Sequence, residues 1–295
     1  MVEILIYSVV NSTVFALIAV GFALVYGVSR VANFAHGALY VVCGFLAWSF
    51  FNSLGLPYWL AVILSLITVT LVGAAIYQFL LIRVRGMPVS EIIVSLAIAL
   101  AILEGLRLQR MGGFRGFIGP GYVLPVFFDR MVKIAGVAID LHRLIIIFIA
   151  LVFIFMMWLF THYTKMGLAL RAIAQNERAA LMLGIDSDWT ATVALSIGSA
   201  LAGLAAITIL PLGQITAEAG YEVLVSALVV CIVGGLGSWT GAILASLFLG
   251  FITTFVAAWG AITYQKVVLF GVILLTLIVK PSGLLGRQKE LEERV

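Results

Sequence analysis

The chain has 295 residues, of which 64% are hydrophobic and only 10% are charged, and its formal net charge is +4. Soluble domains carry about 25% charged residues, so this chain has too few charges to cover a water-soluble surface. The composition therefore excludes a water-soluble domain and predicts a polytopic membrane protein. We interpret the small positive charge as loop charge that orients the chain in the lipid bilayer, and we expect no nucleic-acid partner.

Residues that could carry chemistry are few and scattered. Cys43 and Cys231 lie inside apolar runs, so neither a disulfide framework nor a metal site is expected. His36, His142 and His162 lie far apart, which also argues against a metal site. The phosphate-binding pattern G-x-x-x-x-G-K-[ST] does not occur, and the glycine-rich "GGLGSWTG" lacks the lysine. We therefore expect no catalytic residues, no metal and no cofactor, and any work from ATP would come from a partner protein.

Long apolar runs follow one another along the whole chain. A bilayer core of about 30 Å needs about 20 helical residues, and continuous rather than alternating runs favour helices. Breaks are expected at "NSLGLP" (52–57) and at "GGLGSWTG", because Gly and Pro stop helices. The predicted spans are 4–28, two within 31–82, 88–107, 142–162, 189–211, two within 223–260, and 264–280.

The predicted fold is thus a single all-α transmembrane domain, 1–295, with nine spans, or eight if one short segment is re-entrant. Lys and Arg concentrate in cytoplasmic loops, and here they recur in one set of alternating loops, which carry Arg30, Arg83, Arg85, Lys165, Arg171 and Arg178. The predicted external loop, 108–141, also contains Lys and Arg and conflicts with this pattern. Three short loops and the tail outweigh it, which predicts an external N-terminus and a cytoplasmic C-terminus.

The cytoplasmic loop 163–187 is rich in good helix formers and is punctuated by Gly167 and Gly184. We expect a short amphipathic helix that lies parallel to the membrane. One interpretation is an ordinary interfacial helix that joins two spans. The other is a surface whose apolar side chains meet a partner.

Four motifs in this order resemble one family of transporters. The stretch "RAALMLG" at 178–184 is similar to the cytoplasmic loop motif of ABC importer permeases, although Arg178 stands where that motif usually has Glu. The longer "MGLALRAIAQNERAALMLGI", "NFAHG" with the preceding "ALIAVGFALVYGV", "IVGGLGSWTGAILA" and "VKPSGLLGR" resemble permeases of the branched-chain amino acid ABC importers. The resemblance runs from about residue 12 to residue 287 and includes the "NFAHG" signature of one permease subunit type.

The resemblance implies a non-catalytic subunit in a bacterial or archaeal cytoplasmic membrane. Its implied partners are a second related permease, two cytoplasmic ATPases that bind the ATP, and an external substrate-binding protein. The segment 165–185 would be the coupling helix that sits in an ATPase cleft. The implied coupling residues are Met166, Gly167, Arg171, Asn176, Arg178, Ala179, Ala180, Gly184 and Ile185.

The polar stretch "RVANFAHG" at 30–37 interrupts the apolar runs, and Asn33 is placed to accept from the N–H of Ala35 or His36. One interpretation is a tight turn in which His36 bonds to a neighbouring carbonyl. The other is a half-helix N-terminus that faces the solute path and favours a carboxylate. The glycines of "GGLG" either pack helices closely or bend the chain near the path. The candidate path residues are Asn33, Phe34, His36, Gly37, Gly234 and Gly235.

The predicted function is import of amino acids, with aliphatic ones favoured. Related permeases serve urea, amides, or other polar or aromatic acids, and these solutes stay open as alternatives. An ion-coupled secondary carrier is a further alternative, but such carriers keep an ionisable group in mid-membrane. Here Glu91 and Glu104 lie near opposite ends of one span, and the spacing of Glu104 and Arg107 predicts a simple helical ion pair.

Overall fold

A computed structural model describes residues 2–107, 122–128, 130–134, 137–260 and 264–286. The described residues form helices and one short β-hairpin, joined by short connections. The α-helices are α1 (Val2–Ser29), α2 (His36–Asn52), α3 (Tyr58–Phe79), α4 (Pro88–Arg107), α5 (Leu141–Tyr163), α6 (Lys165–Gln175), α7 (Glu177–Met182), α8 (Ser187–Ile209), α9 (Ala217–Gly234), α10 (Trp239–Ala258) and α11 (Gln265–Val279). Two 3-10 turns, η1 (Leu81–Val84) and η2 (Leu210–Leu212), extend α3 and α8.

The helices confirm the prediction of an all-α polytopic membrane protein. Of the described helices, 7 are long and apolar enough to cross a membrane. The two remaining apolar helices are shorter, with 17 residues in α2 and 15 in α11. Each of the nine predicted spans coincides with one of these helices.

Three segments differ from the prediction because local caps and pairing decide their structure. α9 begins at Ala217 rather than 223, since the Thr216 hydroxyl accepts from the Ala219 N–H at 3.3 Å. The loop 163–187 forms two helices, because the Asn176 side chain starts α7 anew by accepting from the Ala179 N–H at 3.1 Å. In the external loop, β1 (Met131–Ile134) and β2 (Val137–Asp140) form an antiparallel hairpin. The rest of our predictions for 108–121 and 287–295 lies outside the described residues.

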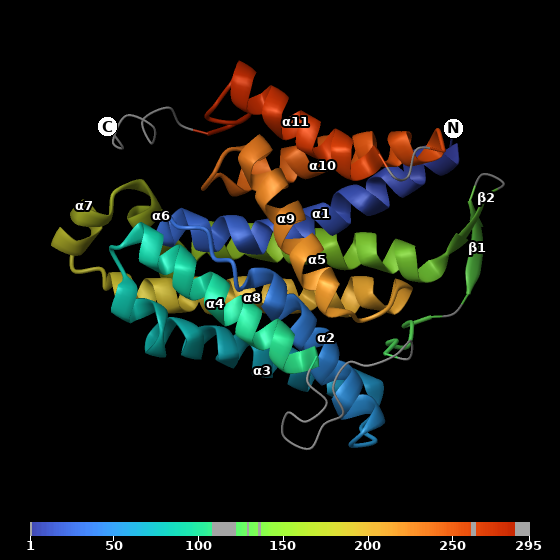
Figure 1. Ribbon diagram of the computed structural model, residues 1–295, viewed down its shortest axis with the longest axis horizontal. Coiled ribbons are helices and arrows are strands. Elements are labelled where there is room, and N and C mark those ends of the chain that lie inside the picture. Colours follow the sequence, from blue (N-terminus) through green and yellow to red (C-terminus); the bar gives the residue numbers. More distant parts are fainter. Residues whose placement is uncertain (1, 108–121, 129, 135–136, 261–263, 287–295) are drawn as a thin grey trace.

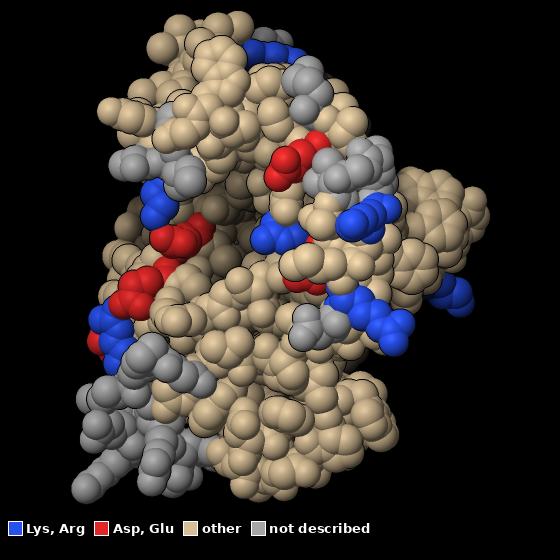
Figure 2. All heavy atoms as spheres, turned by 90° about the vertical axis from the view of Figure 1, so that its right-hand side faces the viewer, with Lys and Arg blue, Asp and Glu red and all other residues tan. Residues whose placement is uncertain are grey.

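The first and the last described residues lie toward opposite ends of the helix bundle (Figure 1). The N-terminus shares its end with β1 and β2, and α6 and α7 share the other end with the last described residues. Figure 2 faces the N-terminal end and shows Lys, Arg, Asp and Glu side chains gathered on it. This distribution fits a bundle whose ends meet water while its sides meet lipid.

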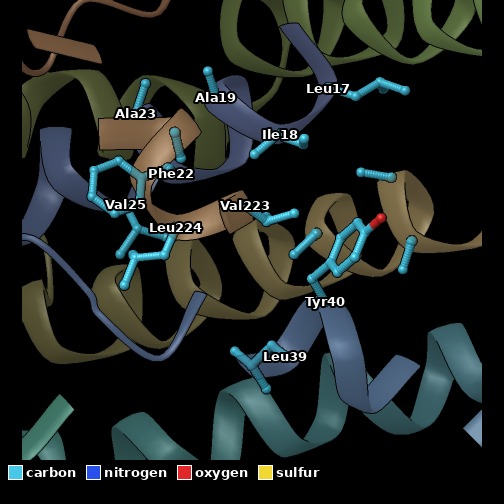
Figure 3. Packing of buried hydrophobic residues seen from close by; sticks show 14 of the residues in the cluster. Leu17, Ile18, Ala19, Phe22, Ala23, Val25, Leu39, Tyr40, Val223 and Leu224 are labelled. Carbon is cyan, nitrogen blue, oxygen red and sulfur yellow. The ribbon is translucent and has the colours of Figure 1, made fainter. Parts of the chain in front are cut away.

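α1 and α8 form the centre of the bundle. α1 packs against α10, α8, α5 and α9, and more than half of the residues of both α1 and α8 are buried. Figure 3 shows side chains of α1, α2 and α9 meeting in this core, with Phe22, Leu39 and Leu224 among them. A helix that is apolar all round and covered by its neighbours is expected for the centre of a membrane bundle.

α2 begins inside the bundle rather than at its surface. His36, the first residue of α2, lies within hydrogen-bond distance of the Ile18 carbonyl, at 3.1 Å, and Ile18 is in the middle of α1. The chain therefore turns back after Ser29 and runs beside α1 for about 16 Å, at 1.5 Å per helical residue, before α2 starts. Residues 30–35 are non-helical backbone at membrane depth, which is tolerated only where protein or a cavity surrounds it.

Candidate functional site

A cavity of about 1310 Å³ opens beside this non-helical segment. It lies between the end of α1, η1, the start of α4, α7 and the start of α8. Its lining is mixed. The polar and charged members are Tyr26, Ser29, Arg30, Asn33, Tyr77, Arg85, Glu91, Ser95, Glu177, Asp186, Ser187 and Asp188. Ligand sites are typically concave and largely apolar with a few placed polar groups, so this cavity is the candidate functional site.

Hydrogen bonds from side chains fix the segment 30–35 against the cavity wall. Arg30 adopts a left-handed conformation (φ 55°), and its Nη2 donates to the Ala174 carbonyl of α6 at 3.1 Å. The Asn33 Oδ1 accepts from the Ala35 N–H at 3.0 Å, as predicted for this residue, and the Phe34 N–H donates to the Ser95 Oγ at 3.2 Å. These contacts satisfy backbone groups that a helix start would otherwise leave unpaired.

One polar atom of this segment has no partner. Asn33 is only 6% exposed, and its Nδ2 makes no hydrogen bond in the described structure. Buried side-chain donors are nearly always paired, because an unpaired one loses its hydration without compensation. The amide of Asn33 is therefore an unpaired donor held within one of the residues that line the cavity.

An ion cluster closes one side of the cavity mouth. Arg85, just after η1, pairs with Glu177 of α7 and with Asp188 of α8, and also donates to the Ser187 hydroxyl. Ser187 in turn donates to Glu177 at 2.6 Å. Three elements that are distant in sequence, η1, α7 and α8, are thus tied together by one guanidinium, whose planar fork suits two carboxylates.

α6 and α7 turn one face inward and one face outward. Thr164 caps α6 by accepting from the Gly167 N–H at 2.9 Å. Leu170, Ile173 and Ala180 are buried against the bundle. The opposite face exposes apolar side chains, namely Leu168 (59%), Leu181 (51%), Met182 (88%) and Leu183 (80%).

Comparison with known proteins decides what kind of chain carries this site. A family model described as the permease component of branched-chain amino acid transport systems matches residues 4–277. The chain belongs to this family. The resemblance drawn from the four motifs is thereby confirmed at the level of the family.

Two curated relatives align with this permease over almost all of its length. The high-affinity branched-chain amino acid transport system permease protein BraD of Pseudomonas aeruginosa is 28% identical over 288 residues, which cover 94% of this chain and 93% of BraD. The corresponding LivH protein of Escherichia coli strain K12 is 28% identical over 294 residues, covering 95% and 94%. The ribose import permease protein RbsC of the same strain is 30% identical over 129 residues, which cover 41% and 40%.

A solved structure shares the fold of this permease. The structure of PsaBC from Streptococcus pneumoniae in complex with Fab matches with a TM-score of 0.51 at 12% sequence identity, covering 99% of this chain and 95% of the other. At this identity the likeness concerns the fold alone.

The structure separates the candidate path residues of the permease into two groups. Asn33 lines the cavity. Phe34, His36, Gly37, Gly234 and Gly235 are not among its lining residues. His36 faces Ile18 of α1, which agrees with the interpretation that it bonds to a neighbouring carbonyl.

The glycines of "GGLG" pack against the end of the described chain. The N–H groups of Leu284 and Leu285 donate to the Val233 and Gly234 carbonyls at 2.8 and 3.0 Å, and so cap the end of α9. Gly235 has φ 104°, and a Cβ there would lie 2.3 Å from the Gly286 backbone nitrogen. Two motifs of the resemblance, "IVGGLG" and "PSGLLG", are therefore partners in space, which their separation in the sequence does not reveal.

The predicted coupling residues of the permease divide by exposure. Asn176, Arg178, Ala179 and Gly184 are exposed, whereas Gly167 and Ala180 are buried. Met166, Arg171 and Ile185 are partly buried. Arg171 points inward, because it lines a cavity of about 80 Å³ together with Gly237 and Trp239, and its Nε is buried without a partner.

Sequence reasoning missed most of the polar cavity wall. Charge patterning identifies Arg85 only as a loop charge, and no motif in the sequence distinguishes Glu177, Ser187 or Asp188. Glu91 and Ser95 lie one helical turn apart on α4, and this i, i+4 spacing was the signal that could have placed them on one face.

Proposed function

We propose that this permease moves branched-chain amino acids into the cytoplasm as a non-catalytic subunit of an importer that partner ATPases drive. The observation that carries this proposal is the family match over residues 4–277. The relatives that align over nearly the whole chain are named as high-affinity branched-chain amino acid permeases, and this supports the choice of solute. We expect no cofactor in the permease itself.

The proposed contact with the ATPases is the coupling surface, which we define as Leu168, Leu181, Met182 and Leu183. These four side chains are 51–88% exposed at the end of the bundle that holds the last described residues. Exposed apolar patches on a surface that faces water mark sites of contact with another protein. α6 and α7 are capped helices rather than irregular loops. A force applied to the coupling surface would therefore move each of them as a rigid body.

Two links would carry such a push to the cavity. Arg85 ties α7 to α8 and to the turn before α4. Arg30 ties the segment 30–35 to the Ala174 carbonyl of α6 at 3.1 Å. Displacement of α6 and α7 would therefore change the cavity mouth and the segment before α2 together, which is what alternating access requires.

The proposed assembly contains a second related permease, two ATPases that touch the coupling surface, and an external binding protein. The proposed location is a bacterial or archaeal cytoplasmic membrane, with α6 and α7 on the cytoplasmic side. The short connections after α1 and α3 and the helices α6 and α7 carry Arg30, Arg83, Arg85, Lys165, Arg171 and Arg178. Lys and Arg in short loops favour the cytoplasmic side, and this supports the proposed orientation.

Replacing an exposed side chain of the coupling surface by a charge tests the proposal. Met182→Glu puts a carboxylate where the ATPase is expected, and since Met182 is 88% exposed the fold loses little. We expect at least a tenfold loss of ATP-dependent leucine uptake in proteoliposomes and loss of the ATPases from the purified complex. Trp259→Glu is the matched control, because Trp259 is 84% exposed at the opposite end of the bundle and should leave ATPase retention unchanged.

Two results would contradict the proposal. Retention of the ATPases by the Met182→Glu complex would remove the coupling surface from the mechanism. Leucine uptake by the isolated permease under an ion gradient, without ATPases, would instead establish a secondary carrier.

A further inference from the structure

Among its described lining residues, the cavity beside α2 contains one unpaired donor and one carboxylate that takes part neither in an ion pair nor in a helix cap. The donor is the Asn33 Nδ2, which is buried and without a partner. The acidic group is Glu91 in the first turn of α4, which lines the same cavity. Glu91 accepts from the Gly86 N–H at 2.8 Å and belongs to none of the described ion pairs. The other carboxylates of the lining are used differently, since Glu177 and Asp188 pair with Arg85 and Asp186 caps α8.

Ser95 connects the surroundings of the two groups, because it touches the segment of Asn33 and lies on the same helix as Glu91. Ser95 contacts the backbone of Phe34, the neighbour of Asn33, at 3.2 Å. Glu91 lies one helical turn before Ser95, about 5–6 Å along the same face. Asn33 and Glu91 therefore line the same part of the cavity.

Apolar side chains complete the same wall. Ile92 of α4, Val28 of α1 and Leu195 of α8 line the cavity. An aliphatic side chain placed against them would leave water, which is favourable in proportion to the apolar area covered. The cavity thus offers a charged acceptor and an apolar surface beside a neutral donor. The charge suits the ammonium and the apolar surface suits the side chain of an aliphatic α-amino acid, and urea has neither group.

We propose that this cavity binds the transported amino acid during its passage, with the solute carboxylate on the Asn33 amide and the solute ammonium on the Glu91 carboxylate. This inference rests on the proposed function and adds a solute site within a single permease chain. Residues 30–35 explain how the site is built, because they hold the amide of Asn33 at membrane depth while Ser95 and Ala35 satisfy the surrounding backbone and the Asn33 oxygen. This segment could not hold Asn33 at that depth if α2 began at the surface.

Two substitutions remove the proposed contacts and keep the local structure. Glu91→Gln retains an oxygen that can accept from the Gly86 N–H and removes only the charge. Asn33→Asp retains the oxygen that accepts from the Ala35 N–H, and replaces the amide donor by an oxygen that repels a carboxylate. Asp186→Asn is the matched control, because it removes a charge from the same cavity lining while Asn caps a helix as well as Asp does.

The test uses the complete transporter with its binding protein and ATPases in proteoliposomes, and measures radiolabelled leucine uptake per ATP hydrolysed. We expect Glu91→Gln and Asn33→Asp each to lower this ratio at least tenfold, and Asp186→Asn to stay within twofold of the wild type. Poor assembly lowers uptake and hydrolysis together, so it leaves the ratio unchanged and does not imitate the expected result.

Each other outcome overturns a stated part of the argument. If the wild type transports leucine and both variants keep its ratio, the solute does not use this site and the path lies elsewhere, for example between two permeases. If Asp186→Asn lowers the ratio as strongly, the loss of any negative charge from the cavity lining is enough to impair uptake. The specific contact between the solute and Glu91 is then refuted. If the wild type hydrolyses ATP but carries no leucine, the proposed function fails, and this inference fails with it.

Discussion

At the scale of single residues, one glycine decides how closely two helices approach. Gly37 lies in the first turn of α2, and a Cβ there would lie 2.0 Å from the Gly220 carbonyl of α9. No side chain fits at this distance, so the crossing of α2 and α9 exists only because position 37 lacks a Cβ. Close approach through small residues is how helices associate where the hydrophobic effect gives no driving force.

Gly37→Ala should therefore destabilise the permease by about 1–3 kcal/mol, the usual cost of forcing extra atoms into a packed core. The measurement is the melting temperature of the purified protein in detergent. Gly271→Ala is the control, since Gly271 lies in α11 with nothing within 4 Å of a Cβ, and Ala favours a helix over Gly. Equal melting temperatures for the two variants would refute the close approach.

At the scale of elements, α7 is a short helix whose position depends on contacts with other elements. A helix from Glu177 to Met182 is too short to be stable alone. Asn176 caps it, Ala180 is its buried residue, and Arg85 holds Glu177 from outside. The ion cluster is what connects this helix to η1 and α8.

Arg85→Gln should loosen α7 without unfolding the bundle. The pairs are partly exposed, so their loss is worth about 1 kcal/mol, which corresponds to about fivefold faster amide exchange in residues 179–183. Hydrogen–deuterium exchange measured by mass spectrometry reports this directly. Arg83→Gln is the control two residues away, because Arg83 is exposed and takes part in none of the described ion pairs. Unchanged exchange in Arg85→Gln would mean that the cluster does not position α7.

At the scale of the whole molecule, the bundle has two distinct ends. The turn after α2 shares the N-terminal end, and the turn before α4 shares the end of α6 and α7 (Figure 1). Both native cysteines, Cys43 and Cys231, are 0% exposed, so they should not react with a polar reagent from either side.

Cysteines introduced at the two ends test the proposed orientation. Ser53→Cys places a thiol in an exposed turn at the N-terminal end. Met87→Cys places one at the other end, where the native Met87 side chain is 49% exposed. In intact cells we expect a membrane-impermeant maleimide to label Ser53→Cys, and to label Met87→Cys only after the membrane is opened. The reverse pattern would invert the topology and place α6 and α7 outside, away from ATP.

The sequence by itself determined the class, the spans and the family. Apolar runs long enough to cross a bilayer can hardly form anything but helices, because lipid offers no partner for a backbone N–H or carbonyl. Breaks at 52–57 and at "GGLGSWTG" follow from local chemistry, as do the oxygen of Asn33 bonded to Ala35 and the ion pair of Glu104 with Arg107 at 2.9 Å. Each of these depends on residues that are neighbours in the chain.

Only the tertiary structure decided where the polar groups meet. Arg85 joins Glu177 and Asp188, about a hundred residues further along the chain, and Asn33 shares a cavity with Glu91. The start of α2 inside the bundle depends on α1, since His36 bonds to the carbonyl of Ile18. Hydropathy records which residues avoid water and cannot record which helices lie side by side, because that follows from the fit of whole surfaces.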